Sequence, residues 1–72
     1  MITTYDIIAH NLRVLRAVKQ MTQEALSVAS GVSRNTINRI ENCDYKSVTV
    51  ELLIKLAAAL QTDVSYFFVH EV

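Results

Sequence analysis

Apolar residues recur along the chain at the three- and four-residue spacing of α-helices. Near the start they stand at Ile8, Leu12 and Leu15, with Val18 closing the run, and the basic side chains lie off this stripe. Because this spacing places the apolar side chains on one face, it predicts an amphipathic helix over about 7–19. No long stretch alternates apolar and polar residues, so the chain is predicted to be all-α.

Start and stop residues divide the rest of the chain into four further helices. Residues of the type that caps helix N-termini stand directly before each run; they are Thr22, Ser33, Thr49 and Asp63. The runs that they open are 23–29, 34–41, 50–60 and 64–68. Gly31 fits the left-handed residue that ends a helix. The last run is ambiguous, because its aromatic and β-branched residues also suit a strand over 64–72.

The run after Ser33 differs from the others in having a narrow apolar face. Only Ile37 and Ile40 are apolar within it, and Val32 leads into it. The remaining positions are polar; they are Arg34, Asn35, Thr36, Asn38 and Arg39. Two short helices that meet through a tight turn, the second with a free polar face, form a helix-turn-helix. We therefore predict this motif at about 23–42.

Composition and length fit one small domain spanning 1–72. The 72 residues include one glycine and no proline, so long linkers and disorder are not expected. No apolar run approaches the roughly 18 residues of a membrane span, and residues 1–6 lack the pattern of a signal peptide. Cys43, the single cysteine, cannot form an internal disulfide. We therefore expect a cytoplasmic protein.

The formal net charge is zero, but the charges are unevenly distributed. Basic residues outnumber acidic ones by three in residues 1–40, and the reverse holds in 41–72. A basic half can face phosphate while an acidic half faces away. The alternative is that this asymmetry is ordinary scatter among few charges.

The stretch TQEALSVASGVSRNTINRIEN, residues 22–42, resembles the helix-turn-helix of the Cro and phage-repressor family. This family is also called lambda-repressor-like or xenobiotic-response-element type. Residues 11–16 resemble its first helix, and residues 53–60 with Phe67 and Phe68 resemble its fourth and fifth. The likeness covers about 7–68. It implies a five-helix, all-α DNA-binding domain in which helices 2 and 3 form the motif.

The chain departs from the family pattern at a few positions. Ser27 stands where alanine is usual, which keeps the site small. Cys43 and Gln61 stand where glycine is usual, and Val48 where proline is frequent. These departures concern the paths of the loops rather than the fold, and the loop over 42–48 is about one residue longer than is common.

The resemblance implies a transcription regulator, a repressor or controller that binds double-stranded DNA sequence-specifically. A recognition helix reads base edges in the major groove, where arginine suits guanine and asparagine suits adenine. The predicted base-reading residues are Arg34, Asn35, Thr36, Asn38 and Arg39, with Asn38 the weakest because it lies further round the helix. The predicted phosphate contacts are Gln23, Ser33, Asn42 and Lys46, and Gln23 would also brace a recognition-helix side chain.

Simpler interpretations of the same residues remain open. Ser33 can serve only as an N-cap, and Asn42 can serve only to end its helix. Arg34 and Arg39 can be solvated surface charges. Arg13 and Arg16 are further candidates for phosphate contacts at the flank.

The excess of hydrophobic residues concentrates near the C-terminus. One or two of these side chains must enter the core, and the others would leave an apolar patch of the kind that marks an interface. The predicted dimer contacts are Tyr66, Phe67, Phe68 and Val69, within the segment 64–72. A two-fold dimer would place its recognition helices about 34 Å apart on a palindromic operator.

Other functions fit the sequence less well. A protein-interaction module of the same fold, such as a toxin-pair or anti-repressor partner, is the alternative that the zero net charge keeps open. The sequence shows no nucleophile–base pair, no phosphate-cradling glycine loop and no metal-ligand spacing at His10 and His70. We therefore expect no enzymatic activity, cofactor, metal or small-molecule ligand.

Overall fold

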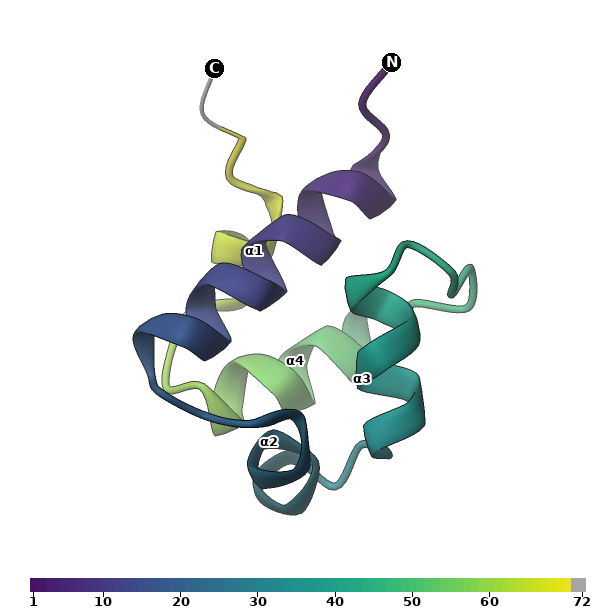
Figure 1. Cartoon of the computed structure of the whole chain (residues 1–72). Coiled ribbons are helices and arrows are strands. Elements are labelled where there is room, and N and C mark those ends of the chain that lie inside the picture. The colour runs from purple at the N-terminus through teal and green to yellow at the C-terminus, as the bar shows by residue number, and fades with distance from the viewer. Residues whose placement is uncertain (71–72) are drawn as a thin grey trace.

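The computed structural model describes residues 1–70 and contains four α-helices and one short 3₁₀ helix in that range (Figure 1). The elements are α1 (Thr4–Val18), α2 (Gln23–Ser30), α3 (Arg34–Glu41), α4 (Val50–Ala59) and η1 (Val64–Phe68). The described residues form no strand, so the all-α prediction is confirmed and the strand alternative is wrong over 64–68. Residues 71 and 72 of the predicted C-terminal segment lie outside the described range.

The predicted fifth helix is a 3₁₀ helix rather than an α-helix. The backbone N–H of Tyr66 bonds the carbonyl of Asp63, the three-residue spacing that defines the 3₁₀ form. Asp63 also accepts from the N–H of Ser65 through its side chain. A run of only five residues suits the 3₁₀ form, which proteins use mainly in short pieces.

The first helix begins earlier than its apolar stripe predicts. Thr3 accepts from the N–H of Asp6, whose carboxylate in turn accepts from the N–H of Thr3, and this capping box starts α1 at Thr4. The stripe begins only at Ile8, so the apolar pattern alone misses the first turn. The N-caps predicted at Thr22, Ser33 and Thr49 are confirmed, each accepting from a backbone N–H in the first turn of its helix.

The helices enclose one core to which every element contributes. Its fully buried large side chains are Phe67, Leu12, Leu26, Ile37, Leu56 and Leu60. Burying such a side chain contributes roughly 1.5–3 kcal/mol. In the core α1 packs on α3 and η1, while α2 packs on α3 and α4, so α3 is held from two sides.

Phe67 corrects one prediction about the dimer contacts. Its side chain is fully buried in the core, where it cannot meet a second chain. Tyr66, Phe68 and Val69 remain 55%, 47% and 46% exposed. The short helix therefore points one aromatic ring inward and leaves its neighbours at the surface.

Left-handed backbone occurs at Gly31, where a turn was predicted, and at the non-glycine residues Gln20, Cys43 and Gln61. Gly31 has a φ of 77° and ends α2, as predicted. Cys43 and Gln61 have φ values of 57° and 55°, although neither is glycine. The two departures from the family pattern therefore keep the left-handed turns, at a cost of roughly 1–2 kcal/mol each.

Candidate nucleic-acid interface

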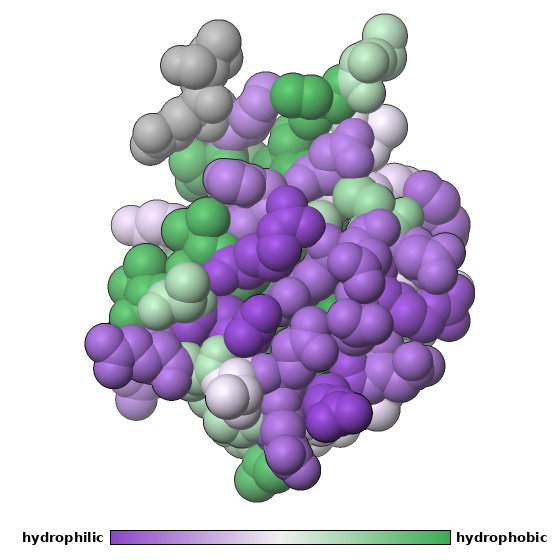
Figure 2. Space-filling view, in the orientation of Figure 1, coloured by the Kyte–Doolittle hydropathy of each residue, from purple (hydrophilic) through white to green (hydrophobic). Residues whose placement is uncertain are grey.

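Helix α3 presents a polar surface because its few apolar residues face the core. Ile37 and Ile40 are buried, whereas Arg34, Asn35 and Asn38 are exposed. Arg39 is exposed as well. Figure 2 shows polar side chains over the part of the surface where α3 lies. The structure thus brings four of the five predicted base-reading residues to the surface of one helix.

Thr36, the fifth predicted base-reading residue, is half-buried and engaged at the helix start. Ser33 Oγ accepts from the Thr36 N–H at 3.1 Å and donates to Thr36 Oγ1 at 2.8 Å. Ser33 is therefore an N-cap, and it also stands exposed at the N-terminal end of α3. Backbone N–H groups at such an end suit a phosphate.

Two predicted phosphate residues are joined to Asn38 by hydrogen bonds. Gln23 Nε2 donates to Asn38 Oδ1 at 3.2 Å, and Asn42 Nδ2 donates to the same oxygen at 3.3 Å. Gln23 opens α2, so its bond to α3 fixes the two helices of the motif relative to one another. The resemblance implies that Gln23 braces a side chain of the third helix, and the hydrogen bond from Gln23 to Asn38 has the geometry that this role needs.

Arg39 is directed toward the loop that follows α3. Its Nε donates to the carbonyl of Asp44 at 3.1 Å and lies 3.7 Å from the Asp44 carboxylate. Its guanidinium also lies 5.2 Å from the centre of the Tyr45 ring. Only Nε is used by these hydrogen bonds, so the two Nη groups can still donate to another molecule.

A buried carboxylate that the sequence interpretation missed lies beneath this face. Glu41 is only 4% exposed, and Arg16 of α1 pairs with it through Nε at 2.8 Å and Nη2 at 3.1 Å. Arg13 donates to the Glu41 carbonyl, and Arg16 also donates to the carbonyl of Met21 at 2.9 Å. The hydrogen bond to Glu41 raises the pKa of Arg16. Glu41 follows Ile37 by four positions, so both residues lie on the same, apolar face of the helix. This spacing is the sequence signal from which the burial of Glu41 could have been predicted.

Arg13 and Arg16, the further candidates for phosphate contacts at the flank, also bond other parts of the fold. One Nη of Arg13, which is an exposed residue, donates to the Glu41 carbonyl, and Arg16 donates to the Glu41 carboxylate and to the Met21 carbonyl. Both side chains therefore connect α1 to the motif.

The loop over 42–48 is attached to the N-terminal part of α1. The ammonium of Lys46 lies 4.5 Å from the centre of the Tyr5 ring, and the Tyr5 hydroxyl donates to the Lys46 carbonyl at 3.5 Å. Cys43 Sγ donates to Asp6 Oδ1 at 3.0 Å. This hydrogen bond raises the pKa of the Cys43 thiol, which disfavours the reactive thiolate. Lys46 itself is exposed.

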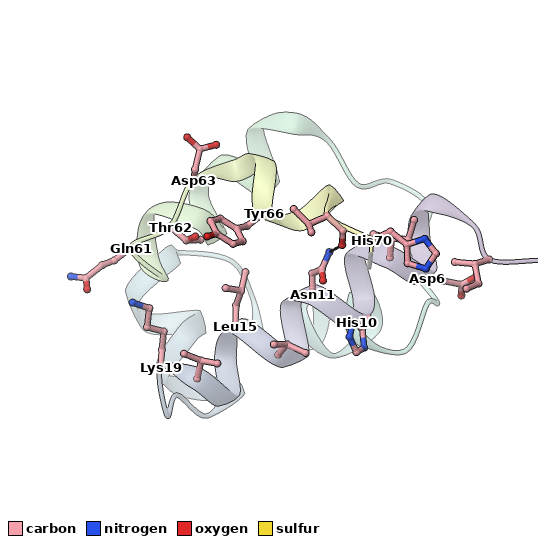
Figure 3. A pocket seen from close by; sticks show the side chains of 15 residues that line it. Asp6, His10, Asn11, Leu15, Lys19, Gln61, Thr62, Asp63, Tyr66 and His70 are labelled. Carbon is pink, nitrogen blue, oxygen red and sulfur yellow. Dashed lines mark hydrogen bonds between the residues drawn. The ribbon is translucent and has the colours of Figure 1, made fainter. Parts of the chain in front are cut away.

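A groove of about 1020 Å³ lies between α1 and η1 (Figure 3), and none of its lining residues belongs to α3. Its apolar lining includes Val14, Leu15 and Val18 of α1, with Tyr66 and Val69 opposite. Leu15 and Tyr66 point toward one another across it (Figure 3). We call this feature the α1–η1 groove.

Within residues 1–70, no three His, Cys, Asp or Glu side chains gather as metal ligands would. None of the helices in the same range is both long and apolar enough to cross a bilayer.

Comparison with known proteins places the chain among regulators with this architecture. The curated control protein C.SmaI of Serratia marcescens is 39% identical over 59 residues, which cover 82% of this chain and 69% of the relative. The crystal structure of the restriction-modification controller protein C.AhdI from Aeromonas hydrophila matches with a TM-score of 0.81 and 31% identity, covering 86% of this chain and 92% of that one.

A longer protein contains a similar domain. The crystal structure of an HTH_3 family transcriptional regulator from Vibrio cholerae matches 89% of this chain with a TM-score of 0.84 and 31% identity. This chain spans only 35% of the length of that regulator. The family model of HTH_3, described as helix-turn-helix, matches residues 12–67, and the chain therefore belongs to the HTH_3 helix-turn-helix family.

Proposed function

We propose that this protein is a transcription regulator that binds double-stranded DNA sequence-specifically, as a homodimer on a palindromic operator. The observation that carries the proposal is the outer face of α3. Its exposed side chains at Arg34, Asn35, Asn38 and Arg39 are those that pair with base edges. The helix is anchored by few apolar residues, so this face is free to enter a groove.

Similarity to two control proteins favours a controller of restriction-modification genes over other regulators. C.SmaI and C.AhdI are relatives of similar size, and this chain covers most of each. A phage or mobile-element repressor is the next candidate. In either role the protein would act in the cytoplasm, beside the DNA that it regulates.

The chemistry of α3 counts against a protein-interaction module. We expect such a module to present an apolar face on its third helix, which a partner would bury, or an acidic face, which would meet a basic partner. Here the exposed residues of α3 are basic or amides, and the acidic Glu41 is buried against Arg16. Exposed apolar residues lie on other elements, among them Val18 and Tyr66 beside the α1–η1 groove.

This separation supports the dimer proposal. Tyr66 and Val69 are exposed apolar residues that line the α1–η1 groove with Val14 and Val18, and Phe68 between them in the sequence is also exposed. Burying such a group against a second copy would leave both α3 faces open to DNA. Sedimentation of the wild type and of Tyr66→Ala tests it: the wild type should associate at lower concentration, and a monomer at every concentration would refute the dimer.

Selection from a random duplex library at two salt concentrations tests DNA recognition. We expect a palindromic site with half-sites about one helical turn apart, and Arg34→Ala should lose preference at one symmetric position. Lys55→Ala is the matched control, because Lys55 lies on α4 and pairs there with Glu51 at 3.8 Å. If no sequence is enriched and residual binding vanishes with modest salt, the proposed function is wrong.

A further inference from the structure

A chain of hydrogen bonds connects the buried carboxylate of Glu41 to the polar face of α3. Arg16 holds both carboxylate oxygens, and Gln23 Nε2 donates to Glu41 Oε1 at 3.1 Å. The same nitrogen donates to Asn38 Oδ1 at 3.2 Å, and Asn42 Nδ2 donates to that oxygen at 3.3 Å. The path therefore runs from α1 through the end of α3 and the start of α2 to the middle of α3.

The charge at one end of this path decides the direction of every amide along it. An ionised carboxylate can only accept hydrogen bonds, so Gln23 must turn its NH₂ group toward Glu41. The two hydrogens of that group are then committed, one to Glu41 and one to Asn38. Asn38 must consequently turn its oxygen inward. An amide oxygen and nitrogen are assigned from their partners, and here the partners leave one choice.

The group that Asn38 turns outward is therefore its Nδ2, which can donate hydrogen bonds but cannot accept them. Its oxygen already accepts from Gln23 and Asn42, which fills both lone pairs. Its Nδ2 has no acceptor among residues 1–70 and remains available. Asn35, also exposed on α3, makes no side-chain hydrogen bond within the same range. Asn35 thus keeps both donor and acceptor, and Asn38 does not.

We propose that Glu41, acting through Gln23, is a positioning residue that makes Asn38 a donor-only reader of the major groove. This inference rests on the proposed function. Guanine offers acceptors at N7 and O6 and thymine offers O4; adenine offers N7 beside its N6 donor, and cytosine offers only the N4 donor. Asn38 therefore favours guanine or thymine at its position, can make a single hydrogen bond to adenine N7, and rejects cytosine. The bidentate pairing with adenine, which needs a free amide oxygen, is left to Asn35.

Amide hydrogen exchange in the DNA-free protein tests the arrangement without reference to DNA. Side-chain NH₂ signals of ¹⁵N-labelled protein should show protected protons on Gln23 and rapidly exchanging protons on Asn38, as fast as those of Asn35. Glu41→Gln should speed the exchange of Gln23, because an amide in place of the carboxylate no longer fixes its direction. Protection of the Asn38 protons, or equal exchange at Gln23 and Asn35, would overturn the inference whether or not the protein binds DNA.

Base selection with Asn38→Asp tests the consequence. An aspartate of the same size still accepts from Gln23 and Asn42 through one oxygen and presents the other outward as an acceptor. Preference at one symmetric position should switch from guanine or thymine to cytosine, by about tenfold or more in relative enrichment. The matched control Asn35→Asp should alter a different position and leave Gln23 exchange as in the wild type.

The outcomes separate the inference from the proposed function. If the wild type enriches no site, the proposed function fails, and the exchange measurement still judges the hydrogen-bond chain. If the wild type enriches a site and Asn38→Asp weakens all sequences equally, Asn38 contacts phosphate and the inference is wrong. Asn38→Asp keeps Glu41 and its ion pair intact, so this arm remains decisive even if Glu41→Gln fails to fold.

Discussion

Replacing Arg16 by methionine should destabilise the protein more than any other loss of a surface-accessible charge. The Glu41 side chain is 5% exposed and the Arg16 side chain 24%, so removing the arginine leaves a nearly buried carboxylate with Gln23 as its remaining side-chain donor. Breaking a buried pair in this way costs about 3–5 kcal/mol. Because Arg16 retains some contact with water, we expect the lower end, about 3 kcal/mol.

The assay is a double-mutant cycle followed by thermal and urea unfolding. In a domain of this size, each kcal/mol lowers the Tm by roughly 4–8 °C, so Arg16→Met should lower it by more than about 10 °C. Adding Glu41→Met removes the stranded charge, and the double variant should recover part of the loss, with a coupling of about 2 kcal/mol. Lys55→Met breaks an exposed pair and should cost below about 1 kcal/mol. Additive losses at Arg16 and Glu41, or equal losses at Arg16 and Lys55, would refute the reasoning.

Three further predictions concern stability and assembly. The backbone and side-chain hydrogen bonds of Thr3 and the thiol of Cys43 lower the pKa of Asp6 from 3.8 to about 2. The resulting stabilisation is present above pH 3.8 and is lost as the pH falls toward 2, so acid titration of Asp6→Asn should show a flatter loss of stability in that window. Gln61→Gly removes a side chain from a left-handed position, so it should raise the free energy of unfolding by up to about 1 kcal/mol, measured as a higher urea midpoint. An unchanged midpoint would contradict that strain. Phe67→Ala should cost about 3–5 kcal/mol in unfolding experiments, whereas Tyr66→Ala should leave the fold intact and weaken self-association; the reverse order would contradict the assignment of core and interface.

Local signals were sufficient to predict most of the helices. Ser33 and Thr49 are N-caps that bond the backbone within three residues, so both the residue type and its effect lie in one short stretch of sequence. Gly31 supplies a left-handed turn that depends on its own missing side chain. Predictions based on such contacts hold because no distant residue is needed to satisfy them. The missed first turn of α1 also had a local signal, the Thr3–Asp6 capping box.

The partners of charged side chains could not be predicted in the same way. Arg16 and Glu41 are 25 positions apart in the sequence, and the helical pattern places Arg16 off the apolar stripe. Only the packing of α1 on α3 brings them together. Similarly, the cluster of aromatic residues near the C-terminus predicts that some side chain enters the core, but the twist of η1 decides that it is Phe67.

The ion pairs also change the meaning of the zero net charge. By sequence, the first forty residues are basic and the remainder acidic, but Arg16 and Arg39 pair with Glu41 and Asp44 across that division. The excess of positive charge available to phosphate is therefore smaller than the sequence count suggests. Since sequence-independent affinity depends on the number of phosphates neutralised, few contacts per chain give weak binding to arbitrary DNA. Under the proposed function, specific binding then draws on base-edge contacts from α3, and the proposed dimer adds the contacts of a second half-site.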